Sequence, residues 1–104
     1  MNLATEVNRE ILGQIAAESI AKLDPESQDG RRWINAIAKA TAEIERNPYM
    51  TFDPESKSLL MMSETSGKIY QANGTCGCRA FQEGYPCRHR AAARLMALYV
   101  ERTR

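Results

Sequence analysis

Three cysteines and the only histidine of this 104-residue chain fall within one short stretch of sequence. They form two close pairs, Cys76-Gly77-Cys78 and Cys87-Arg88-His89, separated by eight residues. Thiolate and imidazole groups are ligands that zinc prefers, and three sulfurs with one nitrogen are a common structural set. We therefore predict that Cys76, Cys78, Cys87 and His89 hold one structural zinc ion.

The spacing of the two pairs also predicts how the ligands converge. On an extended strand, residues i and i+2 point to the same face about 6.6 Å apart, so Cys76 and Cys78 can aim at one point. Pro86 suits the entry to a helix. We expect Cys87 to approach from the end of the loop and His89 from the first helical turn, where the helix N-terminus favours a thiolate.

Other uses of these residues fit the sequence less well. An odd number of cysteines argues against a disulfide framework. A nucleophilic pair of Cys87 and His89 would leave Cys76 and Cys78 without a role. Four protein ligands leave zinc no open position for water or substrate, and no other catalytic constellation is visible. We expect neither an enzyme nor a small-molecule substrate.

The pattern Cys-x-Cys followed by Cys-x-His resembles the SWIM zinc finger, over roughly residues 57–99. The flanking residues agree with that family: Ile69, Tyr70, Phe81, Gly84-x-Pro86 and Ala91–Ala93. The resemblance implies the four zinc ligands named above and a local ββα-like fold. It also implies a module that binds DNA or other proteins. Most members are parts of larger chains, so the helicase or transposase activities of those chains do not carry over.

The first half of the chain predicts a helical hairpin over residues 1–50. Apolar residues recur at helical spacing over residues 3–23, and the stretch from Asp24 to Gly30 interrupts that pattern. Asp29 suits the cap of a second helix, which Asn47-Pro48 should end because the residue before a proline avoids the helical conformation.

The second half, residues 51–104, predicts a short antiparallel meander followed by a helix. Asp53-Pro54-Glu55 indicates a turn, Gly67 suits a left-handed position, and Asn73-Gly74 indicates a hairpin. The expected strands are Ser58–Ser63, Lys68–Ala72 and Thr75–Ala80, and the final helix follows Cys87. The fold class is then α+β, one compact unit in which zinc clamps the third strand to the last helix.

Charge is distributed unevenly along the chain. Residues 1–67 carry seven Lys/Arg and eleven Asp/Glu, a net −4, whereas residues 68–104 carry seven Lys/Arg and two Glu, a net +5. Such a split either marks different partners for the two halves or follows from which helix faces meet water. The first reading predicts that DNA or another nucleic acid binds a basic C-terminal helix and its neighbours, through Lys68, Arg79, Arg88, Arg90 and Arg94.

The alternative function is a protein-interaction adaptor in which the zinc is purely structural. The helical hairpin would then dock its apolar stripe on a partner helix or on a second copy of the chain. Aromatic residues that could anchor such a contact are Trp33, Tyr49, Phe52, Tyr85 and Tyr99. In a chain this small the core also needs aromatics, and we expect Trp33, Phe52 and Phe81 to be buried there.

The sequence predicts no membrane segment and a cytoplasmic location. Its first ten residues are polar and acidic, unlike a signal peptide. The longest apolar stretch, Ala91–Val100, contains Arg94 and is too short to cross a bilayer of about 30 Å. Hydrophobic residues make up 43% and charged residues 26%, which is typical of a globular domain.

Overall fold

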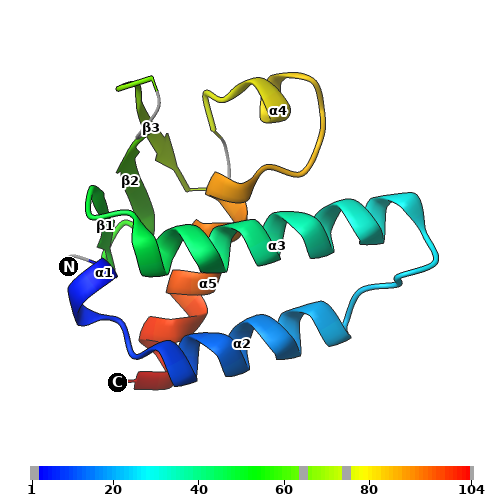
Figure 1. The fold of residues 1–104 in the computed structure, drawn as a ribbon, viewed down its shortest axis with the longest axis horizontal. Coiled ribbons are helices and arrows are strands. Elements are labelled where there is room, and N and C mark those ends of the chain that lie inside the picture. Colours follow the sequence, from blue (N-terminus) through cyan, green and yellow to red (C-terminus); the bar gives the residue numbers. More distant parts are fainter. Residues whose placement is uncertain (1–2, 64–65, 74–75, 104) are drawn as a thin grey trace.

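The computed structural model describes residues 3–63, 66–73 and 76–103. Its elements follow the order α1 (Leu3–Glu6), α2 (Arg9–Ala21), α3 (Gln28–Arg46), β1 (Met50–Asp53), β2 (Ser58–Met62), β3 (Ile69–Ala72), α4 (Arg79–Gln82) and α5 (Arg88–Thr103). The predicted combination of helices with a three-stranded antiparallel sheet is confirmed. In Figure 1, α2 and α3 run side by side and α5 crosses behind both.

The helix predicted over residues 3–23 is interrupted near its start, and that prediction is wrong in this detail. Asn8 adopts an extended conformation as the N-cap of α2, and its side-chain oxygen accepts hydrogen bonds from the Glu10 and Ile11 backbone N–H groups. Its own backbone N–H donates to the Tyr99 hydroxyl at 2.8 Å. A side chain that caps locally competes with the helical ladder, so α1 and α2 are separate helices.

Helix α3 begins and ends on polar caps. Ser27, rather than the expected Asp29, is the N-cap, and its hydroxyl accepts from the Gly30 backbone N–H. The helix ends before Asn47-Pro48, as predicted. The buried Asn47 side chain donates to the Met62 carbonyl at 3.1 Å and accepts from the Tyr49 backbone N–H at 2.8 Å. These bonds attach the end of α3 to the sheet.

The meander contains one strand that the sequence did not predict and lacks one that it did. Strand β1 pairs with β2, and β2 pairs with β3, both antiparallel. The expected third strand at 75–80 is wrong, because Arg79–Gln82 forms the short helix α4. The Asn73-Gly74 hairpin falls partly outside the described residues. Gly67 has the positive φ of 72° that was expected of it.

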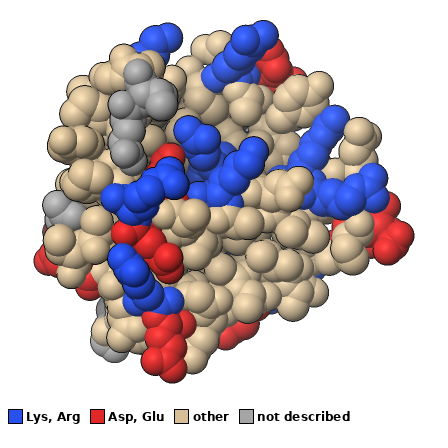
Figure 2. All heavy atoms as spheres, viewed as in Figure 1, with Lys and Arg blue, Asp and Glu red and all other residues tan. Residues whose placement is uncertain are grey.

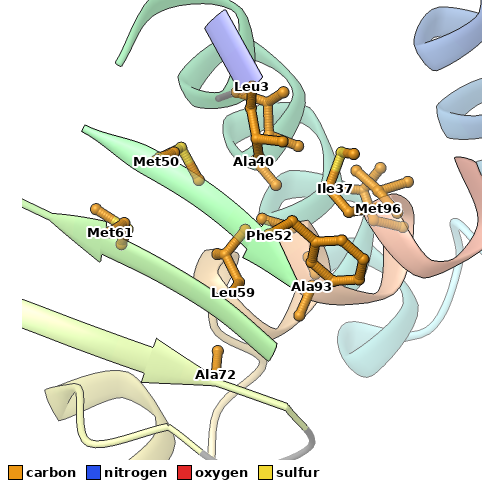
Figure 3. Packing of buried hydrophobic residues seen from close by; sticks show 14 of the residues in the cluster. Leu3, Ile37, Ala40, Met50, Phe52, Leu59, Met61, Ala72, Ala93 and Met96 are labelled. Carbon is orange, nitrogen blue, oxygen red and sulfur yellow. The ribbon is translucent and has the colours of Figure 1, made fainter. Parts of the chain in front are cut away.

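One hydrophobic core joins the sheet to the helices. Figure 3 shows Phe52 of β1 and Leu59 of β2 reaching towards Ala93 and Met96 of α5. Phe52 is buried, as predicted, whereas Trp33 and Phe81 are only partly buried and pack against the edge of the core. Residues from both halves of the chain contribute to this cluster, so α5 is a central packing element.

None of the helices that the structure describes combines the length and the apolar character needed to span a lipid bilayer.

Candidate zinc site and the adjoining groove

The four predicted ligands converge at the N-terminal end of α5. The ligand atoms of Cys76, Cys78, Cys87 and His89 all lie within 4.8 Å of one another, and all four residues are buried. The Cys76 Sγ and His89 Nδ1 atoms are 3.4 Å apart. The cysteines are free thiols, so no disulfide competes for their sulfurs.

Each ligand is positioned by a different feature of the local fold. Cys87 directly precedes α5, and its sulfur accepts a hydrogen bond from the Arg90 backbone N–H at 3.3 Å. His89 projects from the first turn, as expected. The first pair is arranged differently from the prediction, because Cys78 is the N-cap residue of α4 and neither Cys76 nor Cys78 lies in a described strand.

This arrangement fits a zinc ion. Bonds of about 2.3 Å to sulfur and 2.0 Å to nitrogen place the ligands of a tetrahedron roughly 3.5–3.8 Å apart. The separations seen here need only a small contraction to reach that geometry. The chain is therefore positioned to bind one zinc ion through Cys76, Cys78, Cys87 and His89, which clamps the start of α4 to the start of α5.

Burial and mutual proximity make the thiols unequal. Burial raises the pKa of Cys76 to about 12, with a smaller contribution from the charges of Cys87 and Cys78. Burial also raises the pKa of Cys87 above its ordinary value. Burial acts in the same direction on Cys78, but the backbone amides of Phe81 and Ala80 and the two other thiols together bring its pKa below the ordinary value. Zinc binding must therefore displace protons.

The imidazole of His89 is held neutral and oriented by its neighbours. Burial, aided by the charge of Arg88, lowers the pKa of His89 to about 4. The Tyr70 ring of β3 stacks on the imidazole, with centroids 4.8 Å apart and planes inclined by 17°. Its Nδ1 atom faces the Cys76 sulfur, and its buried Nε2 atom has no hydrogen-bond partner among the described residues. A neutral imidazole is the form that binds zinc.

Comparison with known families identifies the segment that carries these ligands. Residues 69–97 match the family model of the SWIM zinc finger, a span that includes β3, α4, all four ligands and the first turns of α5. These residues form a SWIM zinc finger. No curated protein and no solved structure matches the chain significantly.

The five cationic residues that were predicted from the sequence to bind nucleic acid do not gather on one surface of the SWIM finger. Arg88 pairs with Glu43 of α3, with Nε and Oε1 3.3 Å apart. The Arg90 guanidinium lies over the Trp33 ring at 5.6 Å and the Phe81 ring at 5.1 Å, and its Nε is buried. Arg90 therefore serves packing.

The remaining candidates are exposed but dispersed. Arg79 pairs with Glu83 on α4 at 2.9 Å. Lys68 lies just before β3, and Arg94 lies one helical turn after Arg90 on α5. Buried and half-buried residues separate the exposed cations Arg88, Arg94 and Arg102 along α5, so this helix presents no continuous basic face.

A different basic surface lies beside the zinc site. A groove of about 580 Å³ runs between α3 and the finger. Its cationic residues are Arg32 and Lys39 of α3 and Arg88 of α5, and none of the described lining residues is acidic. Figure 2 shows a band of Lys and Arg side chains across this face, over α3. The zinc ligands Cys78, Cys87 and His89 also line the groove.

Sequence reasoning missed the contribution of α3 to this surface. Arg32, Asn35 and Lys39 all line the groove and recur at spacings of three and four residues, which places them on one helix face. That periodicity was visible in the sequence, but only the fold shows that this face meets the zinc finger.

Proposed function

We propose that this chain is a nucleic-acid-binding protein whose fold is stabilised by zinc and whose binding surface is the groove between α3 and the SWIM finger. The observation that carries the proposal is that Arg32 and Lys39 of α3 face one groove, beside Arg88, without an acidic residue among its described lining, although Arg88 itself pairs with Glu43 next to it. Phosphate contacts from such cations supply most of the affinity of non-specific nucleic-acid binding.

The zinc in this proposal is structural. Four protein ligands occupy a tetrahedral ion and leave no position for a reacting water, which argues for binding rather than catalysis. The three cysteine thiols must stay reduced to bind the metal, and a reducing compartment such as the cytoplasm meets that requirement.

The C-terminal helix has a smaller part here than the charge pattern of the sequence implies. It places Arg88, which pairs with Glu43, at the groove. Arg90 is engaged by aromatic rings, and Arg102 pairs with Glu18 of α2 at 2.6 Å. Arg94 and Lys68 lie outside the groove, so substitutions at these two residues serve as controls for substitutions at the groove cations.

Two variants with equal changes in charge test the proposal. In zinc-loaded protein, Arg32→Glu/Lys39→Glu should weaken DNA binding by at least about ten-fold, because two phosphate contacts are lost and two repulsive charges gained. Lys68→Glu/Arg94→Glu changes the net charge by the same amount and should have a much smaller effect. The measurement is fluorescence anisotropy of labelled DNA over a series of salt concentrations.

Three results contradict the proposal. Binding that does not weaken with salt would exclude phosphate contacts as its source. A greater loss in Lys68→Glu/Arg94→Glu would assign binding to the surface that the sequence indicated. Equal losses in both variants would mean that net charge, and not the groove, determines affinity.

An apolar hollow favours a second candidate function, protein interaction. This hollow of about 340 Å³ lies between α2, α3 and α5 and is lined by Leu23, Trp33, Ile37, Ala91, Leu95 and Leu98, among others. Among the described residues that line it, Lys22 and Arg94 are the only charged ones, and both are cationic. A partner segment with one large apolar anchor next to an Asp or Glu would complement it.

A displayed peptide library can test this second candidate. Peptides selected on the zinc-loaded protein should carry an apolar anchor beside an acidic residue, and Leu98→Glu should abolish their capture. Lys22→Glu should instead select peptides in which a Lys or Arg, and not an Asp or Glu, stands next to the apolar anchor. Selection of unrelated sequences, or of the same sequences by all three proteins, would reject the hollow as a docking site.

A further inference from the structure

The groove combines its cations with an exposed aromatic ring. Tyr85 lines the groove and is 43% exposed, one of four large hydrophobic residues left open to solvent in the described part of the chain. The Arg32 guanidinium lies 4.4 Å from the centroid of its ring. Arg32 comes from α3 and Tyr85 from the loop before α5, so the pair bridges the two walls of the groove.

An arginine over a tyrosine ring is a flat, cationic surface of the kind on which a nucleobase stacks. Stacking on aromatic rings and on guanidinium planes is the common way in which proteins hold unpaired bases. Lys39, which also lines the groove, can meet a phosphate that flanks such a base, whereas the charge of Arg88 is already paired with Glu43. The exposed Asn35 amide, also in the lining, offers both a donor and an acceptor.

The size of the groove also favours a single strand. Its volume of about 580 Å³ lies in the range of pockets that enclose a ligand of nucleotide size. In a duplex the base faces are stacked on one another, so the ring of Tyr85 cannot reach them without extruding a nucleotide. An unpaired strand meets no such cost.

We infer that the groove binds single-stranded nucleic acid, with one base against the Arg32–Tyr85 pair and a neighbouring phosphate on Lys39. This inference rests on the proposed function and adds the kind of nucleic acid and the stacking residue. The zinc site supports it, because Tyr85 lies in the loop between the ligands Cys78 and Cys87, whose two ends a bound zinc ion would fix.

The experiment separates the contribution of the bases from that of the phosphates. Zinc-loaded protein is titrated into three probes of about 12 nucleotides: oligothymidylate, an abasic strand with the same phosphates, and a duplex. Oligothymidylate should bind roughly ten-fold more tightly than the abasic strand, the value of about one stacked base. It should also bind more tightly than the duplex.

Substitutions at Tyr85 identify the stacking residue. Tyr85→Leu should lower the affinity for oligothymidylate to that of the abasic strand and leave abasic binding unchanged. Tyr85→Phe, which keeps the ring, should behave as the wild type. Tyr49→Leu is the matched control, because Tyr49 is 56% exposed but does not line the groove. Zinc content and amide dispersion verify that each variant is folded.

The outcomes distinguish this inference from the function on which it rests. Equal binding of the thymidylate and abasic strands, or tighter binding of the duplex, overturns the single-strand inference and leaves phosphate binding intact. Equal weakening of both single strands by Tyr85→Leu also overturns it, because Tyr85 would then act by holding Arg32. Salt-independent binding, or no binding to any probe, removes the proposed function as well.

Discussion

At the scale of single residues, two zinc ligands are buried as protonated thiols that must ionise to bind metal, and the imidazole is already neutral. The raised pKa values of Cys76 and Cys87 keep both protonated near neutral pH in the absence of metal. His89, with a pKa of about 4, carries no additional proton there. Zinc must therefore release at least two protons when it binds.

Zinc affinity should consequently depend steeply on pH. We expect it to fall at least about 100-fold for each pH unit between pH 7.5 and 6, because each released proton contributes about ten-fold per unit. Competition with a chromophoric chelator at several pH values measures the slope. A slope of one proton or fewer would show that two of the thiols are already ionised without zinc.

Two arginines one helical turn apart on α5 should differ in what they contribute to stability. Arg90→Ala should lower the free energy of unfolding by about 1–2 kcal/mol, because its guanidinium packs on the Trp33 and Phe81 rings. Arg94→Ala should change it by less than about 0.5 kcal/mol, since Arg94 is exposed. Urea unfolding of the zinc-loaded proteins measures both, and equal losses would contradict the packing role of Arg90.

At the scale of the elements, two helical glycines differ in the space around them. A Cβ atom on Gly30, in the first turn of α3, would collide with the Asp24 carbonyl oxygen and lie 2.7 Å from the Ser27 hydroxyl. A Cβ on Gly13, within α2, would meet nothing within 4 Å. The connection between α2 and α3 therefore depends on a close backbone approach that Gly30 permits.

The same substitution at these glycines should have opposite effects. Gly30→Ala should destabilise the protein by about 1–3 kcal/mol, because the loop from Asp24 to Ser27 must move. Gly13→Ala should stabilise it by about 0.5–1 kcal/mol, since alanine is the better helix former. Thermal or urea unfolding distinguishes them. A stabilising Gly30→Ala would mean that α3 begins differently.

At the scale of the whole molecule, zinc and the core support each other through α5. The helix begins at the ligands Cys87 and His89 and continues into contacts with α2, α3 and the sheet. Structural zinc contributes apparent binding energies of about 10–16 kcal/mol in isolated fingers, comparable to the stability of an entire domain of about 5–15 kcal/mol. A fold of this size should therefore lose most of its stability when the zinc-binding energy is removed.

Removal of the metal should therefore unfold at least residues 57–99. A strong chelator or Cys78→Ser should abolish the native amide dispersion of that segment in NMR spectra. Tyr70→Phe, which keeps the stacking ring beside His89, should retain stoichiometric zinc and the folded spectrum. Native dispersion of the segment in metal-free protein would contradict a structural role for zinc.

The four zinc-binding residues and the two long helices, α3 and α5, could be predicted from the sequence because the patterns that indicate them are local. The spacing of the cysteines and the histidine follows from the ligands that zinc prefers. The helical periodicity of apolar residues in α3 and α5 can be read from each segment without knowing what it packs against. The strand assignment failed where local signals were weak. Four residues at Met50–Asp53 form a strand only because β2 lies beside them, and the Cys76–Cys78 pair leads into α4.

The amino-acid sequence by itself indicated a zinc-binding site and which four residues form it, since any fold that joins those two pairs produces the same donor set. Only the tertiary structure decided which cations remain available to a ligand. Arg90 is engaged by rings from α3 and α4, and Arg88 pairs with Glu43. Arg32 and Lys39 of α3 border the groove that the distant zinc finger completes. The accessibility of a charge depends on the neighbours that packing supplies, and those neighbours come from distant segments of the chain.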